Sequence, residues 1–145
     1  MTGKHRIAVF ASGYGSNFEA IARATPKEYA SKADFEREIV RRCRAAGVEL
    51  ICLAGYMRIV GDTLLDAYRG RIINLHPSLL PSFKGAHAIE QALAFGVKVY
   101  GATIHYVDES LDGGRIIAQR AVPYEGDDIG ELTAAIHAIE HELYI

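Results

Sequence analysis

The residues best suited to chemistry lie in Asn74-Leu75-His76-Pro77, where an apolar run ends in polar side chains. Asn74 and His76 are two residues apart, so on an extended strand both side chains point to the same side. An amide both donates and accepts hydrogen bonds, and histidine titrates near neutral pH. Such a pair suits acyl chemistry, in which a carbonyl oxygen gains negative charge and a proton moves. Taken alone, however, His76 could simply cap a strand end while Asn74 satisfies the turn.

A third candidate, Asp112, lies in an acidic loop that runs from 108 to 114 and ends in two glycines. Strands are predicted on both sides, over 99–107 and 116–122, so the loop is typical of a hairpin. Its acids could be no more than solvated loop residues. If Asp112 lay beside His76, its carboxylate would keep the imidazole charged and oriented, as a carboxylate does for a catalytic histidine.

A glycine-containing turn near the start of the chain indicates an anion site. A predicted strand over 6–11 leads into Ser12-Gly13-Tyr14-Gly15-Ser16-Asn17 and then a helix that begins near Phe18. Backbone N–H groups and the helix dipole at such a turn attract a phosphate. Phe18 replaces the third glycine of a dinucleotide fingerprint, so phosphate is predicted and dinucleotide is not. A plain strand-to-helix turn with an N-cap is the alternative.

The elements that must position these residues alternate between strand and helix. Further strands are predicted over 48–55 and 71–75, and helices over 31–46, 62–68, 89–95 and from Asp128 onward. Ser31 and Asp128 are predicted N-caps, and Gly47 and Gly96 are predicted to follow helix ends. The alternation predicts an α/β fold, with an open, mostly parallel, Rossmann-like sheet and helices on both faces.

One interruption breaks this alternation. The helix after the glycine turn and the helix over 31–46 follow each other with no strand between them. A βαβ unit of roughly thirty residues would fill the gap. We therefore expect that one βαβ segment of the fold is missing near Thr25 and Pro26.

Composition limits the class of protein. The chain has 145 residues and is 50% hydrophobic, which predicts a single globular domain over 1–145. A formal net charge of −2 without a basic block disfavours a nucleic-acid partner. Cys43 and Cys52 have no metal spacing and are interpreted as reduced cysteines of a cytoplasmic protein. No apolar run reaches the length of a signal or membrane segment, so no membrane partner is expected.

The last predicted helix contains His137-Ala138-Ile139-Glu140-His141, which matches the pattern of inverted zinc peptidases. His137 and His141 lie one helical turn apart. A catalytic zinc also needs a third protein ligand and an open position. Only four residues follow His141 to supply that ligand, so we expect no metal.

Four motifs together resemble the folate-dependent formyltransferases. They are Ser-Gly-x-Gly-Ser-Asn from Ser12, Ala-Gly-Tyr-Met-Arg-Ile from Ala54, Asn-x-His-Pro-Ser-Leu-Leu-Pro from Asn74 and Asp-Glu-x-Leu-Asp-Gly-Gly from Asp108. The resemblance runs from Arg6 to Tyr144 and favours the branch that acts on glycinamide ribonucleotide in purine (IMP) biosynthesis. It implies transfer of a formyl group from 10-formyltetrahydrofolate to the amine of 5'-phosphoribosylglycinamide, without a metal.

The same resemblance implies a role for individual residues. The catalytic residues would be Asn74, His76 and Asp112. The phosphate and the glycinamide end of the substrate would be held by Gly13, Gly15, Ser16, Asn17 and Glu140. The folate would be bound by Lys32, Met57, Arg58, Ile59, Val60, Asn74, Val107 and Asp108.

Three alternatives stay open. Formyltetrahydrofolate hydrolase resembles the same catalytic trio but passes the formyl group to water, and the predicted phosphate loop argues against it. Methionyl-tRNA formyltransferase is disfavoured because no basic domain is appended. A truncated, non-catalytic nucleotide- or folate-binding module is the third alternative. The expected assembly is a monomer or a weak homodimer.

Overall fold

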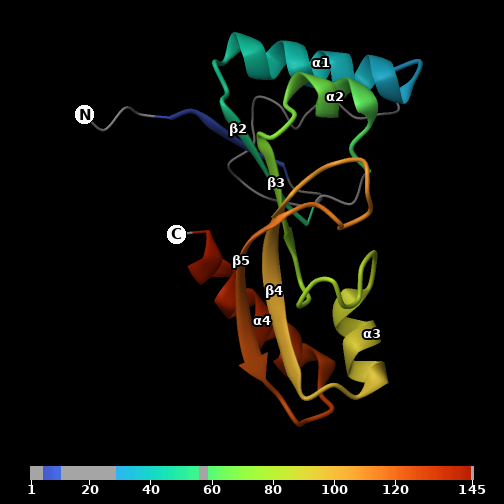
Figure 1. Cartoon of the computed structure of the whole chain (residues 1–145), viewed down its shortest axis with the longest axis vertical. Coiled ribbons are helices and arrows are strands. Elements are labelled where there is room, and N and C mark those ends of the chain that lie inside the picture. Colours follow the sequence, from blue (N-terminus) through green and yellow to red (C-terminus); the bar gives the residue numbers. More distant parts are fainter. Residues whose placement is uncertain (1–4, 11–28, 56–58, 145) are drawn as a thin grey trace. The chain divides into compact units, whose positions relative to one another are not determined.

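The computed structural model describes residues 5–10, 29–55 and 59–144. Strands and helices alternate in it as predicted, which confirms the α/β class (Figure 1). In chain order the elements are β1 (Ile7–Phe10), α1 (Lys32–Ala45), β2 (Leu50–Ala54), α2 (Asp62–Ala67), β3 (Ile72–His76), α3 (Ala88–Phe95), β4 (Val99–Tyr106), β5 (Ile116–Pro123) and α4 (Ile129–Leu143). The strands form one sheet in the order β1-β2-β3-β4-β5.

The predicted elements within the described residues are all present, with ends that differ by a few residues at most. The most useful difference is at β3, which was predicted to end at Leu75 and instead extends through His76. Pro77 follows at once and cannot continue the hydrogen-bond ladder. His76 is therefore held by the last residue of a strand. The helix predicted to begin near Phe18 and the glycine turn before it lie outside the described residues.

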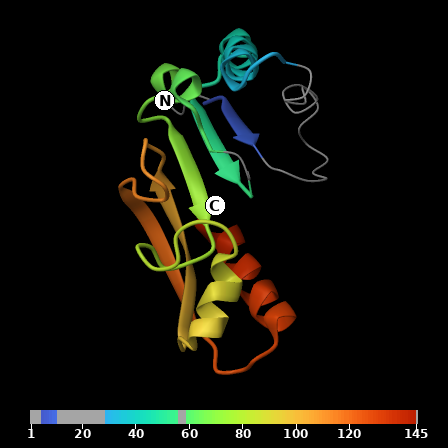
Figure 2. The ribbon, with the colours of Figure 1, turned by 90° about the vertical axis from the view of Figure 1, so that its right-hand side faces the viewer.

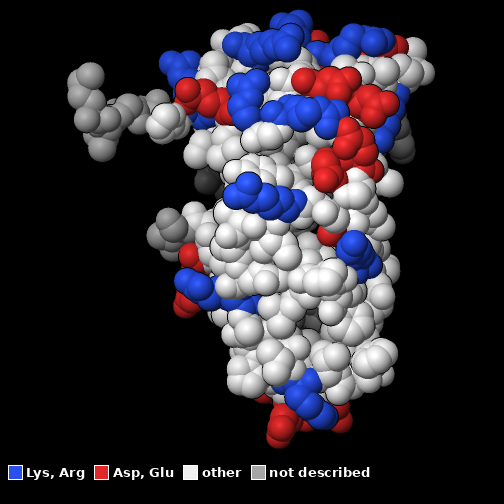
Figure 3. Space-filling model, in the orientation of Figure 1, with Lys and Arg blue, Asp and Glu red and all other residues white. Residues whose placement is uncertain are grey.

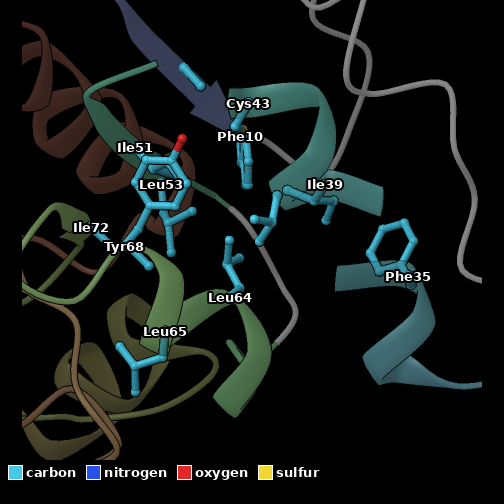
Figure 4. Close-up of a cluster of buried hydrophobic side chains, with 12 residues drawn as sticks. Phe10, Phe35, Ile39, Cys43, Ile51, Leu53, Leu64, Leu65, Tyr68 and Ile72 are labelled. Atoms are coloured by element: carbon cyan, nitrogen blue, oxygen red, sulfur yellow. The ribbon is translucent and has the colours of Figure 1, made fainter. Parts of the chain in front are cut away.

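The described chain divides into two compact units. The first contains residues up to Ile73 together with Val107–Glu109. In it, β1 and β2 pair in parallel, with Ile7 opposite Leu50. Figure 4 shows its core, in which apolar side chains from α1, β2 and α2 meet, among them Ile39, Ile51 and Leu64. Burial of such side chains is the main stabilising term for this unit.

Each of the two helices of the first unit, α1 and α2, begins at a side chain that caps it. Ser31 caps α1 as predicted, since its hydroxyl accepts the N–H of Asp34 at 3.1 Å. Helix α2 begins after Gly61, which has no side chain to cap it. The buried carboxylate of Glu36, on α1, accepts the N–H of Gly61 at 2.7 Å and that of Leu64 at 3.3 Å. A side chain of one helix thus caps the next helix.

The second unit contains Asn74–Tyr106 and the chain from Ser110 onward. Its centre is the predicted hairpin, in which β4 and β5 pair antiparallel. Helices α3 and α4 lie on the same side of this hairpin (Figure 2). Their contact is a second apolar cluster of Ile89, Ala92, Tyr100, Leu132 and Ile136. Asp128 caps α4 as predicted and accepts the N–H groups of Gly130 and Glu131.

The surface of α1 and α2 carries charges of both signs (Figure 3). Several of these charges form pairs, such as Arg42 with Glu38 within α1 at 2.9 Å, and Asp66 of α2 with Arg69 just past the end of that helix at 2.9 Å. Exposed pairs of this kind contribute little to stability. None of the helices in the described part of the chain has the length and apolar content that a membrane span needs.

Candidate active site

His76 is the centre of the candidate site. It is 5% exposed. Its Nε2 lies 2.8 Å from the carbonyl oxygen of Phe83. A carbonyl can only accept, so Nε2 must carry the proton of that hydrogen bond. The other ring nitrogen, Nδ1, is then the one that can gain or lose a proton in a reaction.

Asp112 faces that second nitrogen. Its Oδ2 lies 3.6 Å from Nδ1 of His76, which is an ion-pair distance and longer than a hydrogen bond. The same oxygen accepts the N–H of Gly85 at 2.7 Å. The backbone of Asp112 has φ of 50°, a left-handed conformation that aspartate and asparagine tolerate better than most residues. A strand end and a tight loop therefore bring the two groups together.

His105 is a functional candidate that the sequence reasoning missed. It lies on β4 and is 2% exposed. Its Nε2 is 3.2 Å from Nδ2 of Asn74 and 3.6 Å from Oδ1 of Asp112. A signal for it existed, because ligands of open α/β sheets bind at the carboxyl ends of strands and His105 is the penultimate residue of β4.

The hydrogen bonds of His105 also orient Asn74. The Nδ1 of His105 lies 2.8 Å from the carbonyl oxygen of Tyr106 and must donate to it. A neutral His105 then has a lone pair on Nε2, which accepts one hydrogen of the Asn74 amide. The second amide hydrogen of Asn74 stays available to a substrate oxygen. The site thus presents an oriented amide donor and an imidazole beside a carboxylate, a set that can stabilise an oxyanion and move a proton.

The remaining predicted site residues fall into three groups. The first group lies outside the described residues and contains Gly13, Gly15, Ser16, Asn17, Met57 and Arg58. The second group belongs to the first unit and contains Lys32, Ile59, Val60, Val107 and Asp108. Of these, Ile59 is 73% exposed, whereas Val60 and Val107 pack against the core. Glu140 lies on α4 of the second unit, and its Oε2 is 2.8 Å from Nδ1 of His137.

The cysteines are not part of this site. Both are free and buried. Burial raises the pKa of the Cys43 thiol to about 11 and also raises the pKa of Cys52. Neither is therefore an activated nucleophile at neutral pH. Within residues 5–10, 29–55 and 59–144, no group of three or more His, Cys, Asp or Glu side chains is arranged to hold a metal ion.

An amide and two imidazoles at strand ends of an open α/β sheet, with a carboxylate from the loop after β4, form a set that suits transfer of an acyl group. The chain belongs to the formyl transferase family, whose pattern matches residues 22–145. The resemblance to formyltransferases and the predicted fold are thereby confirmed.

Three relatives specify the similarity further. The chain is 46% identical to phosphoribosylglycinamide formyltransferase of Bacillus subtilis, over 96% of this chain and 90% of that protein. It is 34% identical to the human trifunctional purine biosynthetic protein adenosine-3, over 97% of this chain but 18% of that much longer protein. The crystal structure of phosphoribosylglycinamide formyltransferase from Streptococcus pneumoniae superposes with a TM-score of 0.87 at 44% identity, covering 97% of this chain and 95% of that one.

The Bacillus subtilis alignment also bears on the expected missing segment. It extends over 176 positions, although the present chain has 145 residues. The relative therefore carries residues that have no counterpart here. This difference in length agrees with the expected absence of one βαβ segment.

Proposed function

We propose that this chain transfers a formyl group from 10-formyltetrahydrofolate to the amine of 5'-phosphoribosylglycinamide, a step of purine (IMP) biosynthesis. Its family and its relatives named phosphoribosylglycinamide formyltransferase support this reaction. The single observation that carries the proposal is the cluster around Asp112, in which one carboxylate lies 3.6 Å from both His76 and His105. Residues 1–145 are proposed to act as one catalytic domain.

The proposed mechanism uses His76, Asn74 and Asp112. The substrate amine attacks the formyl carbon, so a C–N bond forms and the carbonyl oxygen becomes negatively charged. The charged imidazole of His76 and the free amide hydrogen of Asn74 stabilise this oxyanion. The Oδ2 atom of Asp112 lies 3.6 Å from the Nδ1 of that imidazole. Collapse of the intermediate breaks the bond to the folate nitrogen, which takes up the proton that the attacking amine loses.

Substrate binding is assigned to the other predicted residues. Gly13, Gly15, Ser16 and Asn17 would hold the phosphate, and Glu140 would meet the glycinamide end. The folate would contact Lys32, Met57, Arg58, Ile59, Val60, Asn74, Val107 and Asp108. The exposed apolar side chain of Ile59 is suited to a flat heterocycle. We place the protein in the cytoplasm, which the two free cysteines support.

A direct assay tests the proposed function. Purified chain is incubated with 10-formyltetrahydrofolate, with and without 5'-phosphoribosylglycinamide, and both formylated product and free formate are measured. Formylated product that forms only when both substrates are present supports the transferase. Formate release without the acceptor would identify a hydrolase instead. Binding of either compound without turnover would identify the non-catalytic module.

A further inference from the structure

Gln119 lies on β5, outside the cluster around Asp112, yet its side chain bonds to the loop that follows His76. Its Nε2 donates to the carbonyl oxygen of Leu80 at 2.9 Å and to the hydroxyl of Thr103 at 3.0 Å. An amide Nε2 has two hydrogens, and both are used here. We propose that Gln119, together with Thr103, is a positioning residue that sets the orientation of the His76 ring. The proposal rests on the function proposed above only for its effect on turnover.

Thr103 completes the connection between the hairpin and the loop. Its side chain is fully buried on β4, and its hydroxyl donates to the carbonyl oxygen of Ser78 at 2.7 Å. The same oxygen accepts the N–H of Leu80 at 3.2 Å and the amide of Gln119. A hydroxyl can donate once and accept twice, so Thr103 is fully satisfied. The buried hydroxyl of Thr103 thus fixes the loop to β4, and Gln119, an exposed residue of β5, adds two donors to the same contact.

The loop after His76 also packs closely against the β4–β5 hairpin at Gly101. Gly101 lies on the same face of β4 as Thr103, because alternate strand residues share a face. A Cβ atom at Gly101 would collide with the side chain of Leu79 and with the carbonyl oxygen of Arg120. The missing side chain is therefore what lets Leu79 approach the hairpin.

The loop that these contacts hold in place ends beside His76. Ser78 donates from its hydroxyl to the carbonyl oxygen of Ser82 at 2.6 Å, which ties the two ends of the loop together. The next carbonyl, that of Phe83, accepts the Nε2 proton of His76 at 2.8 Å. This hydrogen bond holds the ring with Nε2 toward the carbonyl and Nδ1 toward Asp112, and it places the proton of the neutral ring on Nε2. Gln119 and Thr103 act on the reaction through that carbonyl.

Two variants of Gln119 test this role. Gln119→Glu and Gln119→Met keep the length of the side chain but remove both donors. We expect kcat for formyl transfer to fall between about tenfold and a hundredfold, the effect of a small misplacement of a catalytic group. The KM of both substrates should stay within about twofold, because binding contacts are unchanged. The control is Ile117→Thr, an exposed change two residues away on the same strand, which should leave kcat near the wild-type value.

A spectroscopic measurement separates positioning from plain stability and needs no substrate. In ¹⁵N-labelled wild-type chain, the neutral His76 ring should carry its proton on Nε2. In Gln119→Met and Thr103→Val we expect a mixture of tautomers, whereas Thr103→Ser keeps the hydroxyl and should retain the wild-type signal. An unchanged His76 tautomer in Gln119→Met and in Thr103→Val would overturn the proposal. Altered tautomers in an enzyme without formyl transfer would support it while contradicting the proposed function. If Gln119→Glu does not fold, the His76 tautomer and kcat of Gln119→Met alone test the proposal.

Discussion

The Oδ2 atom of Asp112 lies 3.6 Å from Nδ1 of His76 and at the same time accepts the backbone N–H of Gly85 at 2.7 Å. The backbone hydrogen bond holds the carboxylate in place without using up its charge. The carboxylate is therefore held beside the imidazole before any substrate binds. Distances of this kind commonly shorten when a reactant occupies the site.

Replacing Asp112 by asparagine should remove the charge and little else. Asparagine also tolerates the left-handed backbone conformation at this position, where φ is 50°. We expect kcat to fall by about a hundredfold or more, as it does when a catalytic histidine loses its carboxylate or an oxyanion loses a donor. Steady-state kinetics of Asp112→Asn and of His76→Ala measure this. Rates near the wild type in both variants would contradict the proposed mechanism.

Replacing His105 should lower kcat, because His105 orients the Asn74 amide. In His105→Leu the Asn74 amide loses its buried acceptor, so kcat should fall by about fivefold, the equivalent of one hydrogen bond of about 1 kcal/mol. The matched variant His105→Gln retains a side-chain oxygen that can accept from the amide, and its kcat should fall less. Equal rates for His105→Leu and wild type would show that Asn74 does not need this partner.

Glu36 should contribute to stability because it caps α2 from α1. It is 4% exposed and accepts the N–H groups of Gly61 and Leu64. Glu36→Ala leaves buried donors unpaired, which should lower the free energy of unfolding by about 1–3 kcal/mol. Gly61→Ala should also destabilise, because its new Cβ would lie 2.6 Å from Oε1 of Glu36. Urea unfolding measures both.

Glu38 on the same helix is the control for Glu36. Its carboxylate forms partly exposed pairs with Arg41 and Arg42, which hold its pKa at about 2. Because water screens such pairs, Glu38→Ala should change stability less than Glu36→Ala. A larger loss in Glu38→Ala would mean that the cap from Glu36 is unimportant.

Stability should decrease at alkaline pH because of the buried thiols. Burial raises the pKa of Cys43 from 9.0 to about 11, so between these values the unfolded chain ionises while the folded chain does not. The unfolded state then binds fewer protons, and stability falls as pH rises through this window. The raised pKa values of Cys52 and Tyr68 act in the same direction.

Urea unfolding between pH 8 and pH 11 checks this prediction. Cys43→Ala should be less stable at pH 8 because a buried sulfur is lost, but its stability should fall less steeply with pH. An equal slope in the variant and the wild type would exclude Cys43 as a cause. A native chain should also resist thiol alkylation near neutral pH and react after unfolding.

The sequence by itself determined the local parts of this protein. Strand and helix positions follow from the spacing of apolar residues, and the caps at Ser31 and Asp128 act over two or three residues. The pairing of Asn74 with His76 was likewise visible, because the two share one strand. Family motifs then pointed to Asp112. All of these signals depend on residues that are neighbours in the chain or on the motifs of a known family.

Tertiary structure decided which distant residues support the site. Asn74 and His105 are 31 residues apart, Gln119 and Leu80 are 39 apart, and Glu36 and Gly61 are 25 apart. Each contact depends on strand pairing or helix packing, which bring together residues that no local pattern links. A shift of one residue in the pairing of β4 and β5 would turn Gln119 to the opposite face. The sequence predicted a role for His76, but the orientation of its ring depends on the register of the sheet.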